Sequence, residues 1–331
     1  MRTAFFQALM ELAARDERVF LVVGDLGFGV VEPFAKKFPD RYLNAGVAEQ
    51  NMTGLAAGLA LCGKIVFTYS IANFPTLRCL EQIRNDVCYH NANVKIVAVG
   101  GGFSYGSLGM THHATEDLAI LRALPCMTVV APGDPEEARQ AVHAIAQVPG
   151  PCYLRLGRAG EPDVHTTAIN FQLGKAIPMR EGEDLTLIST GAMLATTVQV
   201  ADHLAAEGVQ ARVLSMPTLK PLDEEAVLGA ARETGAIVTL EEHSVLGGLG
   251  SAVAEVLAEN ACRPVAFKRI GLPSAFSSRA GSQEYLRDVN GLSEGAILET
   301  IHTLLGRKNQ IPHAPSRRPA SLDDGLKPFA G

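Results

Sequence analysis

The chain has 331 residues, of which 47% are hydrophobic and 19% are charged, and it contains no tryptophan. This composition is typical of soluble globular proteins, and the length is enough for two domains. The net charge of −6 gives no sign of the clustered basic surface that binds nucleic acid. No run of 18 apolar residues and no signal-peptide pattern are present, so we expect neither a membrane-spanning helix nor a secreted protein.

Six cysteines are scattered along the chain without a Cys-x-x-Cys pair, and most stand inside apolar stretches: Cys62, Cys79, Cys88, Cys126, Cys152 and Cys262. Buried thiols of this kind are typical of a reducing cytoplasm, and their spacing does not indicate a zinc site. We therefore expect a cytoplasmic protein whose own residues hold no metal ion.

The first half of the chain alternates between helical and strand patterns. Residues 3–15 have helical spacing, and the apolar run 19–23 follows and ends at Gly24-Asp25. Further strands are predicted near 42–45, 65–69, 94–99, 127–131 and 152–156. Continuous runs of Val, Ile and Leu are typical of strands covered on both faces, as in a parallel sheet. The pattern predicts an α/β domain over residues 1–160.

Residues 161–183 lose this periodicity and gain glycine, proline and charge, so we expect a linker there. A second alternating block covers 184–306, with strands predicted near 185–190, 211–216, 236–241 and 265–270. Residues 307–331 are rich in proline and poor in apolar side chains, which predicts an extended or disordered tail. The predicted fold class is α/β, with two doubly wound, mostly parallel-sheet domains.

The carboxyl ends of parallel strands are where open α/β sheets bind ligands. That edge collects the segments that follow successive strands: Gly24-Asp25, 46–49, 69–74, 99–125 and 155–158. Glu49 begins a helix otherwise built largely from Gly, Ala, Leu and Met. Burial there disfavours the carboxylate anion, whereas the helix N-terminus favours it. A carboxyl group balanced in this way can exchange a proton with a bound heterocycle near neutral pH.

Other polar groups at this edge have weaker signals. The glycine-rich loop 100–109 fits neither GxGxxG nor a Walker pattern, so a substrate-lining loop is favoured over a phosphate cradle. His112 and His113 are adjacent but have no third ligand at zinc spacing. Arg155 and Arg158 flank a glycine at a strand end, where they could clamp an anionic group or simply lie at the surface.

Three segments resemble the transketolase-like thiamine diphosphate enzymes, in order, over residues 1 to about 305. "NAGVAEQNMTGLAAGLA" resembles a motif of the pyrimidine-binding domain, "THHATEDLAILRALPCMTVVAPGDPEEA" the segment downstream of it, and "EEHSVLGGLGSAVAEVL" part of the C-terminal domain. The resemblance implies that Glu49 bonds a ring nitrogen of the cofactor's aminopyrimidine and favours its imino tautomer. Carbanion chemistry then belongs to the cofactor, and the protein supplies orientation and electrostatics.

The resemblance also implies roles for residues around Glu49. His112 matches a histidine that contacts substrate near the reacting carbon, and His113 stands where that segment has Gln. Arg158 matches an arginine that binds the sugar phosphate, and Arg2 matches another at the start of the domain. These four residues are the expected substrate-binding set.

Cofactor binding further implies an aromatic wall beside the pyrimidine ring. Phe74 is the first candidate for this wall and Tyr69 the second, and Asp25 is a further cofactor-binding candidate at the same edge. Two departures from the family pattern leave the sugar preference open. Leu108 replaces an aspartate that reads a sugar hydroxyl, and Gly100 replaces a substrate histidine.

The family anchors diphosphate and Mg²⁺ through a GDG motif followed downstream by Asn, and Gly24-Asp25-Leu26 does not match it. We therefore expect the C-terminal subunit of a split transketolase. Its partner, an N-terminal transketolase subunit with the diphosphate-binding domain, is expected to hold the diphosphate and Mg²⁺. Two copies of the chain are expected to pair, which gives a heterotetramer, and the chain alone is expected to show no turnover.

The expected reaction moves a ketol unit from a ketose, as its phosphate, to an aldose. Two alternatives stay open: the β subunit of a 2-oxoacid dehydrogenase or a deoxyxylulose-phosphate synthase-like enzyme, and a non-catalytic scaffold subunit. Thr111-His112 and Arg158 favour transketolase chemistry, and an intact Glu49 argues against a scaffold. Residues 241–243, Glu-Glu-His, also stand at a predicted strand end, where a structural role is favoured over a site.

Overall fold

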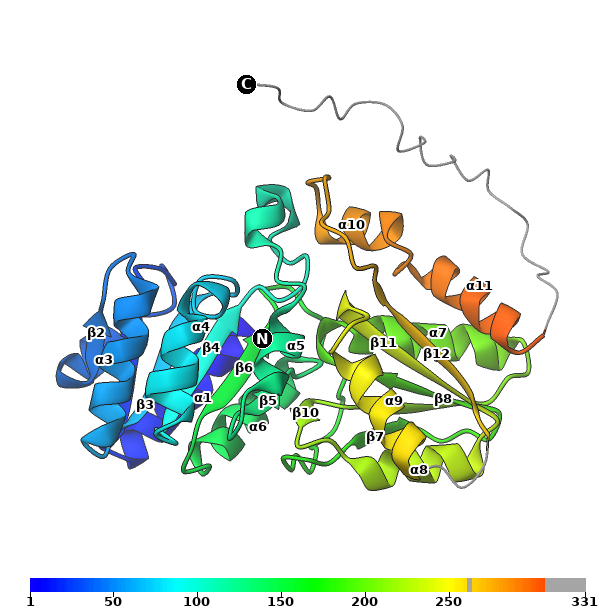
Figure 1. Ribbon diagram of the computed structural model, residues 1–331, viewed down its shortest axis with the longest axis horizontal. Helices are drawn as coiled ribbons and strands as arrows, with labels where there is room; N and C mark the ends of the chain where they lie inside the picture. Colours follow the sequence, from blue (N-terminus) through cyan, green and yellow to red (C-terminus); the bar gives the residue numbers. More distant parts are fainter. Residues whose placement is uncertain (261–263, 307–331) are drawn as a thin grey trace.

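The computed structural model describes residues 1–260 and 264–306, and the tail predicted for 307–331 lies outside this range. The described chain forms two α/β domains that lie side by side, each with a central sheet between helices (Figure 1). This arrangement confirms the predicted fold class. It also places the carboxyl ends of the strands of the first sheet close to the second domain, so both domains can contribute residues to a site there.

The first sheet has seven strands in the order β10-β5-β6-β4-β3-β1-β2, and all neighbours are parallel except β10 and β5. The strands predicted from apolar runs are confirmed. Their bounds are β1 Val19–Val23, β2 Tyr42–Asn44, β3 Ile65–Ile71, β4 Val94–Val99, β5 Thr128–Val130, β6 Cys152–Leu156 and β10 Thr218–Lys220. Because β10 follows the start of the second domain in sequence, this edge strand fastens the second domain to the first sheet.

Helices cover both faces of the first sheet, as its continuous apolar strands require. The larger helices are α1 Arg2–Arg15, α2 Glu32–Lys37, α3 Glu49–Leu61, α5 Asp117–Ala123 and α6 Pro135–Ala146. Shorter turns are η1 Pro39–Arg41, η2 Leu77–Cys79, α4 Leu80–Gln82, the π-helix η3 Ile83–Cys88, η4 Gly106–Leu108 and η5 Met110–His112. Helices α1 and α6 pack together on one face, and α3 packs with η3 on the other.

The second sheet has five strands in the order β12-β11-β8-β9-β7, and its neighbours are parallel except β7 and β9. The strands are β7 Ile177–Arg180, β8 Leu185–Ser189, β9 Ala211–Ser215, β11 Ala236–Ser244 and β12 Ala266–Leu272. The helices are η6 Gly191–Met193, α7 Leu194–Ala206, α8 Glu224–Glu233, α9 Leu249–Asn260, α10 Gln283–Val289 and α11 Glu294–Leu304. Here too the four strands predicted from apolar runs are present.

The prediction of a linker over 161–183 is wrong in part, because β7 lies inside that segment and pairs with β9. Strand β7 is a short edge strand that contains Pro178, and only Ile177 of its residues is buried. Proline is tolerated at a sheet edge because one side of the strand needs no partner. A strand of this kind lacks the apolar run on which the prediction relied.

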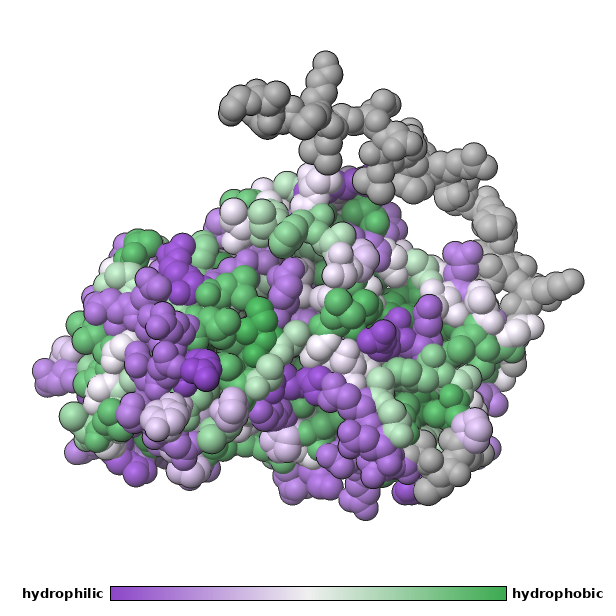
Figure 2. All heavy atoms as spheres, in the orientation of Figure 1, coloured by the Kyte–Doolittle hydropathy of each residue, from purple (hydrophilic) through white to green (hydrophobic). Residues whose placement is uncertain are grey.

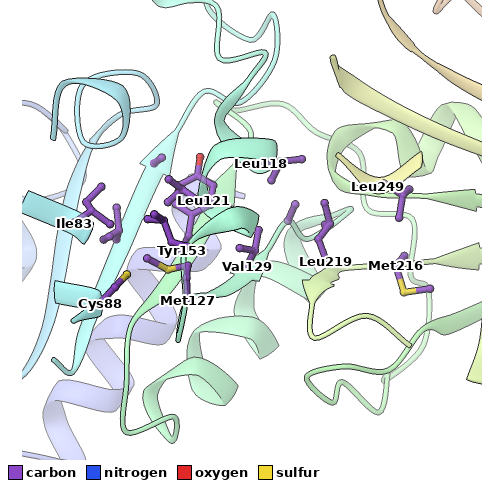
Figure 3. Packing of buried hydrophobic residues seen from close by; sticks show 14 of the residues in the cluster. Ile83, Cys88, Leu118, Leu121, Met127, Val129, Tyr153, Met216, Leu219 and Leu249 are labelled. Carbon is purple, nitrogen blue, oxygen red and sulfur yellow. The ribbon is translucent and has the colours of Figure 1, made fainter. Parts of the chain in front are cut away.

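One apolar cluster continues from the first domain into the second. Figure 3 shows it running from Ile83 and Cys88, past Tyr153, to Met216 and Leu249. Packed apolar side chains that are shared in this way bury surface from both domains in one core. The two domains are therefore expected to move as a unit.

The surface of the molecule mixes hydrophilic and hydrophobic residues on the face drawn in Figure 2. Large apolar side chains that are well exposed include Phe28, Val47, Tyr89 and Phe276. None of the helices within 1–260 and 264–306 combines the length and apolar character needed to cross a bilayer.

Candidate functional site

Glu49 begins α3 at the carboxyl edge of the first sheet, and its side chain is only 1% exposed. Its Oε1 accepts a hydrogen bond from the Ser70 hydroxyl at 3.2 Å, and its Oε2 accepts one from Nη1 of Arg78 at 2.8 Å. Both donors come from β3 and the segment that follows it. A buried carboxylate needs such partners, since an unpaired buried charge is strongly destabilising.

Gly24, directly after β1, faces the same carboxylate. A Cβ placed there would lie 3.3 Å from Cγ of Glu49 and 3.4 Å from Oγ of Ser70. The absence of a side chain at Gly24 therefore leaves space beside the carboxyl group. On the other side, the Thr53 hydroxyl donates to the main-chain oxygen of Glu49 at 2.9 Å and steadies the first turn of α3.

Phe74 connects this carboxylate to the histidine segment. The guanidinium carbon of Arg78 lies 4.8 Å from the centre of the Phe74 ring, within cation–π distance. The Phe74 ring also contacts the ring of His112 edge-on, with the two ring centroids 5.2 Å apart. Glu49, Arg78, Phe74 and His112 thus form one continuous row at the carboxyl edge of the sheet.

Tyr69 lies on the opposite face of the sheet from that row. Its ring stacks on Phe5 at 5.8 Å and meets Phe6 edge-on at 5.0 Å, both residues of α1. Successive side chains of a strand point to opposite faces, so Ser70 reaches Glu49 while Tyr69 is buried under α1. This burial raises the pKa of the Tyr69 phenol above its usual range.

Asp25 is exposed at the end of β1, with a left-handed backbone at φ 54°. Its carboxylate accepts a hydrogen bond from Nδ2 of Asn44 at 2.9 Å, and its amide donates to Oδ1 of Asn44 at 3.1 Å. Asp25 and Asn44 therefore tie together the ends of β1 and β2. The hydrogen bonds of Asp25 thus go to Asn44, at the same edge of the sheet as Glu49.

The two histidines differ in their environments. Nδ1 of His112, which is half-buried, lies 3.1 Å from the Thr111 hydroxyl. His113 is buried, its Nε2 lies 3.2 Å from the main-chain oxygen of Gly106, and its ring meets Phe103 edge-on at 5.0 Å. His112 is therefore the more accessible of the pair, and His113 fixes the loop that carries it.

Tyr105 connects Arg158, one of the predicted arginines, to this row. Its ring centre lies 5.1 Å from the guanidinium carbon of Arg158 and 6.5 Å from the ring centre of His112. Burial raises the pKa of the Tyr105 phenol, and the charges of Arg158 and Arg2 act in the opposite direction. Gly100 makes the close packing feasible, because a Cβ at that position would lie 2.1 Å from the Tyr105 ring.

Arg155 is held inside the chain, which fits neither of the two possibilities left open for it, an anion clamp or a surface position. It is buried, and its guanidinium donates to Asp117 at 2.9 Å and to the main-chain oxygens of Ala114 and Glu242 at 2.7 and 3.0 Å. These bonds use Nε and Nη2 of Arg155, and the bond to Glu242 bridges the two domains. Position alone did not separate Arg155, inside the strand, from the exposed Arg158 beyond it.

Residues 241–243 at the end of β11 are also structural, as favoured. Glu241 accepts hydrogen bonds from the amides of Leu249 and Gly250 at 2.7 and 2.8 Å and so caps α9. Glu242 accepts from the amide of Phe103 at 2.5 Å, which joins the domains. His243 is buried, and burial lowers its pKa.

A cavity of about 580 Å³ opens between the two domains beside the row. Its first-domain wall includes Asn73, Phe74, Arg78, His113 and Glu116, and its second-domain wall includes Ser244, Asn290 and the segment 272–277. Arg78 and Phe74 are therefore shared between the cavity and the surroundings of Glu49. Among the described residues, no three His, Cys, Asp or Glu side chains gather to hold a metal ion.

Three residues of this site were missed by the sequence reasoning: Ser70, Arg78 and Tyr105. Ser70 lies within the segment 69–74 predicted to follow the third strand, whereas Arg78 lies four residues beyond its end. An arginine four residues after a candidate aromatic was the only available signal for Arg78. Tyr105 is the aromatic residue in the middle of the glycine-rich loop, where a ring needs a bare backbone beside it.

Comparison with known proteins identifies this architecture. The transketolase pyrimidine-binding domain matches residues 1–160, and the transketolase C-terminal domain matches residues 174–297. One subunit of the apulose-4-phosphate transketolase of Phocaeicola vulgatus is 42% identical over 301 residues, which cover 90% of this chain and 95% of that relative. The chain belongs to the transketolase family. The predicted likeness to a subunit of a split transketolase is confirmed.

A solved structure of this transketolase type has the same fold. It is described as a split-gene transketolase in an inactive β4 tetramer, and it is 41% identical, covers 93% of this chain and 98% of its own, and has a TM-score of 0.83. The 1-deoxy-D-xylulose-5-phosphate synthase of Desulforudis audaxviator is 33% identical over 316 residues, but the chain spans only 49% of it. The synthase alternative is thus the more distant and partial match.

Proposed function

We propose that this transketolase subunit supplies the pyrimidine side of a thiamine diphosphate site, with Glu49 as the carboxyl group that bonds a ring nitrogen of the aminopyrimidine. The observation that carries the proposal is the buried carboxylate of Glu49 at the carboxyl edge of the first sheet, beside the bare backbone of Gly24. A buried carboxylate with space next to it suits a hydrogen bond to a flat ring.

The neighbouring residues fit such a ring. Phe74 offers an aromatic face next to Arg78, the residue that bonds Glu49. Gly24 leaves open a space beside Glu49 that any larger residue would fill with its Cβ. When bound, the cofactor supplies the carbanion-stabilising chemistry. The chain's part is to hold and exchange a proton at Oε2 of Glu49. Tyr69 supports the site from the far face of β3, and Asp25 orients the end of β1 toward the cofactor.

Substrate binding in this proposal is assigned to the end of the row at His112 and Tyr105, away from Glu49. His112, next to Phe74, is placed to hydrogen-bond an oxygen near the reacting carbon of a sugar, and the buried His113 fixes the loop of His112. Arg158 over the Tyr105 ring, and Arg2 whose charge also acts on Tyr105, provide positive charge for the phosphate of a ketose or aldose phosphate. Transfer of a ketol unit between such sugars is the reaction this arrangement suits.

The proposal includes a partner chain and self-association. A relative of this chain is named as one subunit of a transketolase, and a solved neighbour is described as an inactive β4 tetramer. Both names support an N-terminal transketolase subunit that brings the diphosphate-binding domain and Mg²⁺, and a pair of copies of this chain within a heterotetramer. The chain alone is then expected to lack turnover, and adding the partner is expected to restore it. Turnover by the purified chain without a partner would contradict this arrangement.

The central test is Glu49→Gln in the complex with the partner subunit. Loss of the proton-exchanging carboxyl is expected to lower kcat by about 10³-fold, the range of general acid–base catalysis. Ketol transfer is followed with a ketose phosphate and an aldehyde, and pyruvate serves as the donor for the synthase alternative. Glu81→Gln, an exposed carboxylate near Arg78 in sequence, is the matched control. Unchanged turnover in Glu49→Gln would favour the scaffold alternative instead.

A further inference from the structure

Arg78 stands between the interdomain cavity and the carboxylate of Glu49. Its side chain is 46% exposed, whereas that of Glu49 is 1% exposed, and Nη1 of Arg78 reaches Oε2 of Glu49 at 2.8 Å. Arg78 also lines the cavity of about 580 Å³ between the domains. A molecule that approaches Glu49 from the cavity therefore meets the guanidinium first.

The two oxygens of Glu49 are not equivalent. Oε1 accepts from Ser70 and would lie 3.5 Å from a Cβ at Gly24, so it borders the space beside that glycine. Oε2 accepts its hydrogen bond from Arg78, and Arg78 is the residue of this pair that lines the cavity. A donor that reaches Oε2 from the cavity must therefore replace the guanidinium of Arg78.

The guanidinium group of Arg78 makes two contacts in the site, one with Glu49 and one with the ring of Phe74. It is planar, it donates a hydrogen bond to a carboxylate, and it lies over the ring of Phe74 at 4.8 Å. A flat heterocycle bound at Glu49 would make the same two contacts, a hydrogen bond from a ring nitrogen and a stacked aromatic neighbour. Arg78 therefore provides in the cofactor-free chain what the ring would provide in the loaded one.

We propose that Arg78 is a placeholder, whose guanidinium pairs with Glu49 in the cofactor-free subunit and leaves Oε2 when the aminopyrimidine binds; this rests on the proposed role of Glu49. The pairing protects a buried carboxylate from being left without a partner. It also opposes cofactor binding, because a ligand must displace the guanidinium. The cavity gives the long side chain room to withdraw, and Glu116 on its wall can receive the charge.

The experiment measures the dissociation constant of thiamine diphosphate by titration calorimetry of the assembled enzyme with Mg²⁺. Arg78→Met is expected to tighten binding about tenfold, since a hydrogen bond to a charged group no longer has to be broken. Arg78→Lys, which keeps the charge but cannot stack as a plane, is expected to tighten it less. Arg84→Met, an exposed arginine six residues further on, is the control and is expected to leave binding unchanged. Unchanged or weaker binding by both Arg78 variants would overturn the placeholder.

Glu49→Gln and the double variant with Arg78→Met separate this proposal from the function on which it rests. If Glu49→Gln weakens cofactor binding but Arg78→Met does not tighten it, the placeholder fails and the role of Glu49 stands. If Glu49→Gln leaves binding unchanged, the role of Glu49 fails and the placeholder fails with it. If both hold, Arg78→Met is expected to have no further effect in the Glu49→Gln background. The melting temperature of the cofactor-free chain gives an independent readout, which Arg78→Met but not Arg84→Met is expected to lower. If Arg78→Met does not fold, Arg78→Lys decides by the same comparisons.

Discussion

A side chain at Gly24 would enter the space beside Glu49 in the proposed cofactor site. Gly24→Ala would place a methyl group 3.3 Å from Cγ of Glu49, a distance at which the neighbour must shift by a few tenths of an ångström. We expect the dissociation constant for thiamine diphosphate in the assembled enzyme to rise by about tenfold, because small misplacements of site groups are costly. Gly58→Ala on α3, where a Cβ meets nothing within 4 Å, is the control and is expected to leave affinity unchanged. Equal affinities for the two variants would show that the space beside Gly24 is not used.

Among single residues, those fixed by local pattern were predictable, and those fixed by distant partners were not. The position of Glu49 at the start of α3 and its burial were predictable, because a carboxylate at the start of an apolar helix, after a strand, is visible in the sequence. Arg78 was missed because its pairing with Glu49 joins residues 29 positions apart and depends on how η2 turns back toward α3. Arg155 was misread for the same reason, since its main-chain partner at Glu242 belongs to the other domain.

The same distinction holds among elements. Strands such as β4 and β6 are buried along their whole length, and their apolar runs gave their positions within one or two residues. The edge strands β7 and β10 were not predicted, because each is short and pairs antiparallel with only one neighbour. One neighbour and one covered face leave no continuous apolar run to detect.

The junction of β11 and α9 carries a pH-dependent prediction. Burial raises the pKa of Glu241 from 4.5 to about 7, although the amides of Leu249 and Gly250 favour its anion. A raised pKa means that the folded chain holds a proton that the unfolded chain has released, so this group lowers stability as pH rises from about 4.5 through 7. Relative to wild type, Glu241→Gln is expected to gain about 2.5 kcal/mol of unfolding free energy at pH 8 compared with pH 5, at 1.36 kcal/mol per unit.

Urea unfolding at the two pH values measures this difference for Glu241→Gln. Glu259→Gln, an exposed carboxylate near the end of α9, is the matched control and is expected to differ from wild type equally at both pH values. A constant difference for Glu241→Gln as well would mean that Glu241 is already ionised at pH 5. In that case the capping of α9 would depend on the anion throughout.

At the scale of the whole molecule, buried polar contacts hold the two domains in a defined orientation, in addition to the apolar core that they share. Glu242 pairs with Arg287 of α10 and accepts from the amide of Phe103 in the first domain, while β10 extends the first sheet. Contacts of this kind fix the angle between the domains, because each loses its geometry if one domain turns. The width of the cavity beside Arg78 is therefore set by both domains together.

A third connection runs through the segment between the domains and makes the last prediction. Nε2 of His165 lies 2.9 Å from Oε1 of Glu137, which also accepts from the Ser215 hydroxyl of β9 at 2.6 Å. The amides of Val164 and His165 donate to Asp134 at 3.0 and 2.9 Å. Burial alone would lower the pKa of His165, but the hydrogen bond and the charge of Glu137 outweigh it and raise that pKa above 6.5.

The stabilisation from His165 is therefore complete below pH 6.5 and is lost as the pH rises through the raised pKa of the folded chain. Hydrogen exchange of the Val164 and His165 amides, expressed as protection factors to remove the intrinsic pH effect, reports this loss directly. Protection is expected to fall between pH 6 and pH 9 in wild type and to be low at both in His165→Gln. As a control, His143 of α6 lies 3.4 Å from Glu11 of α1 and does not contact this segment's partner Glu137, so His143→Gln should behave as wild type. Protection that stays constant with pH in wild type would show that Asp134 alone holds this segment against α6.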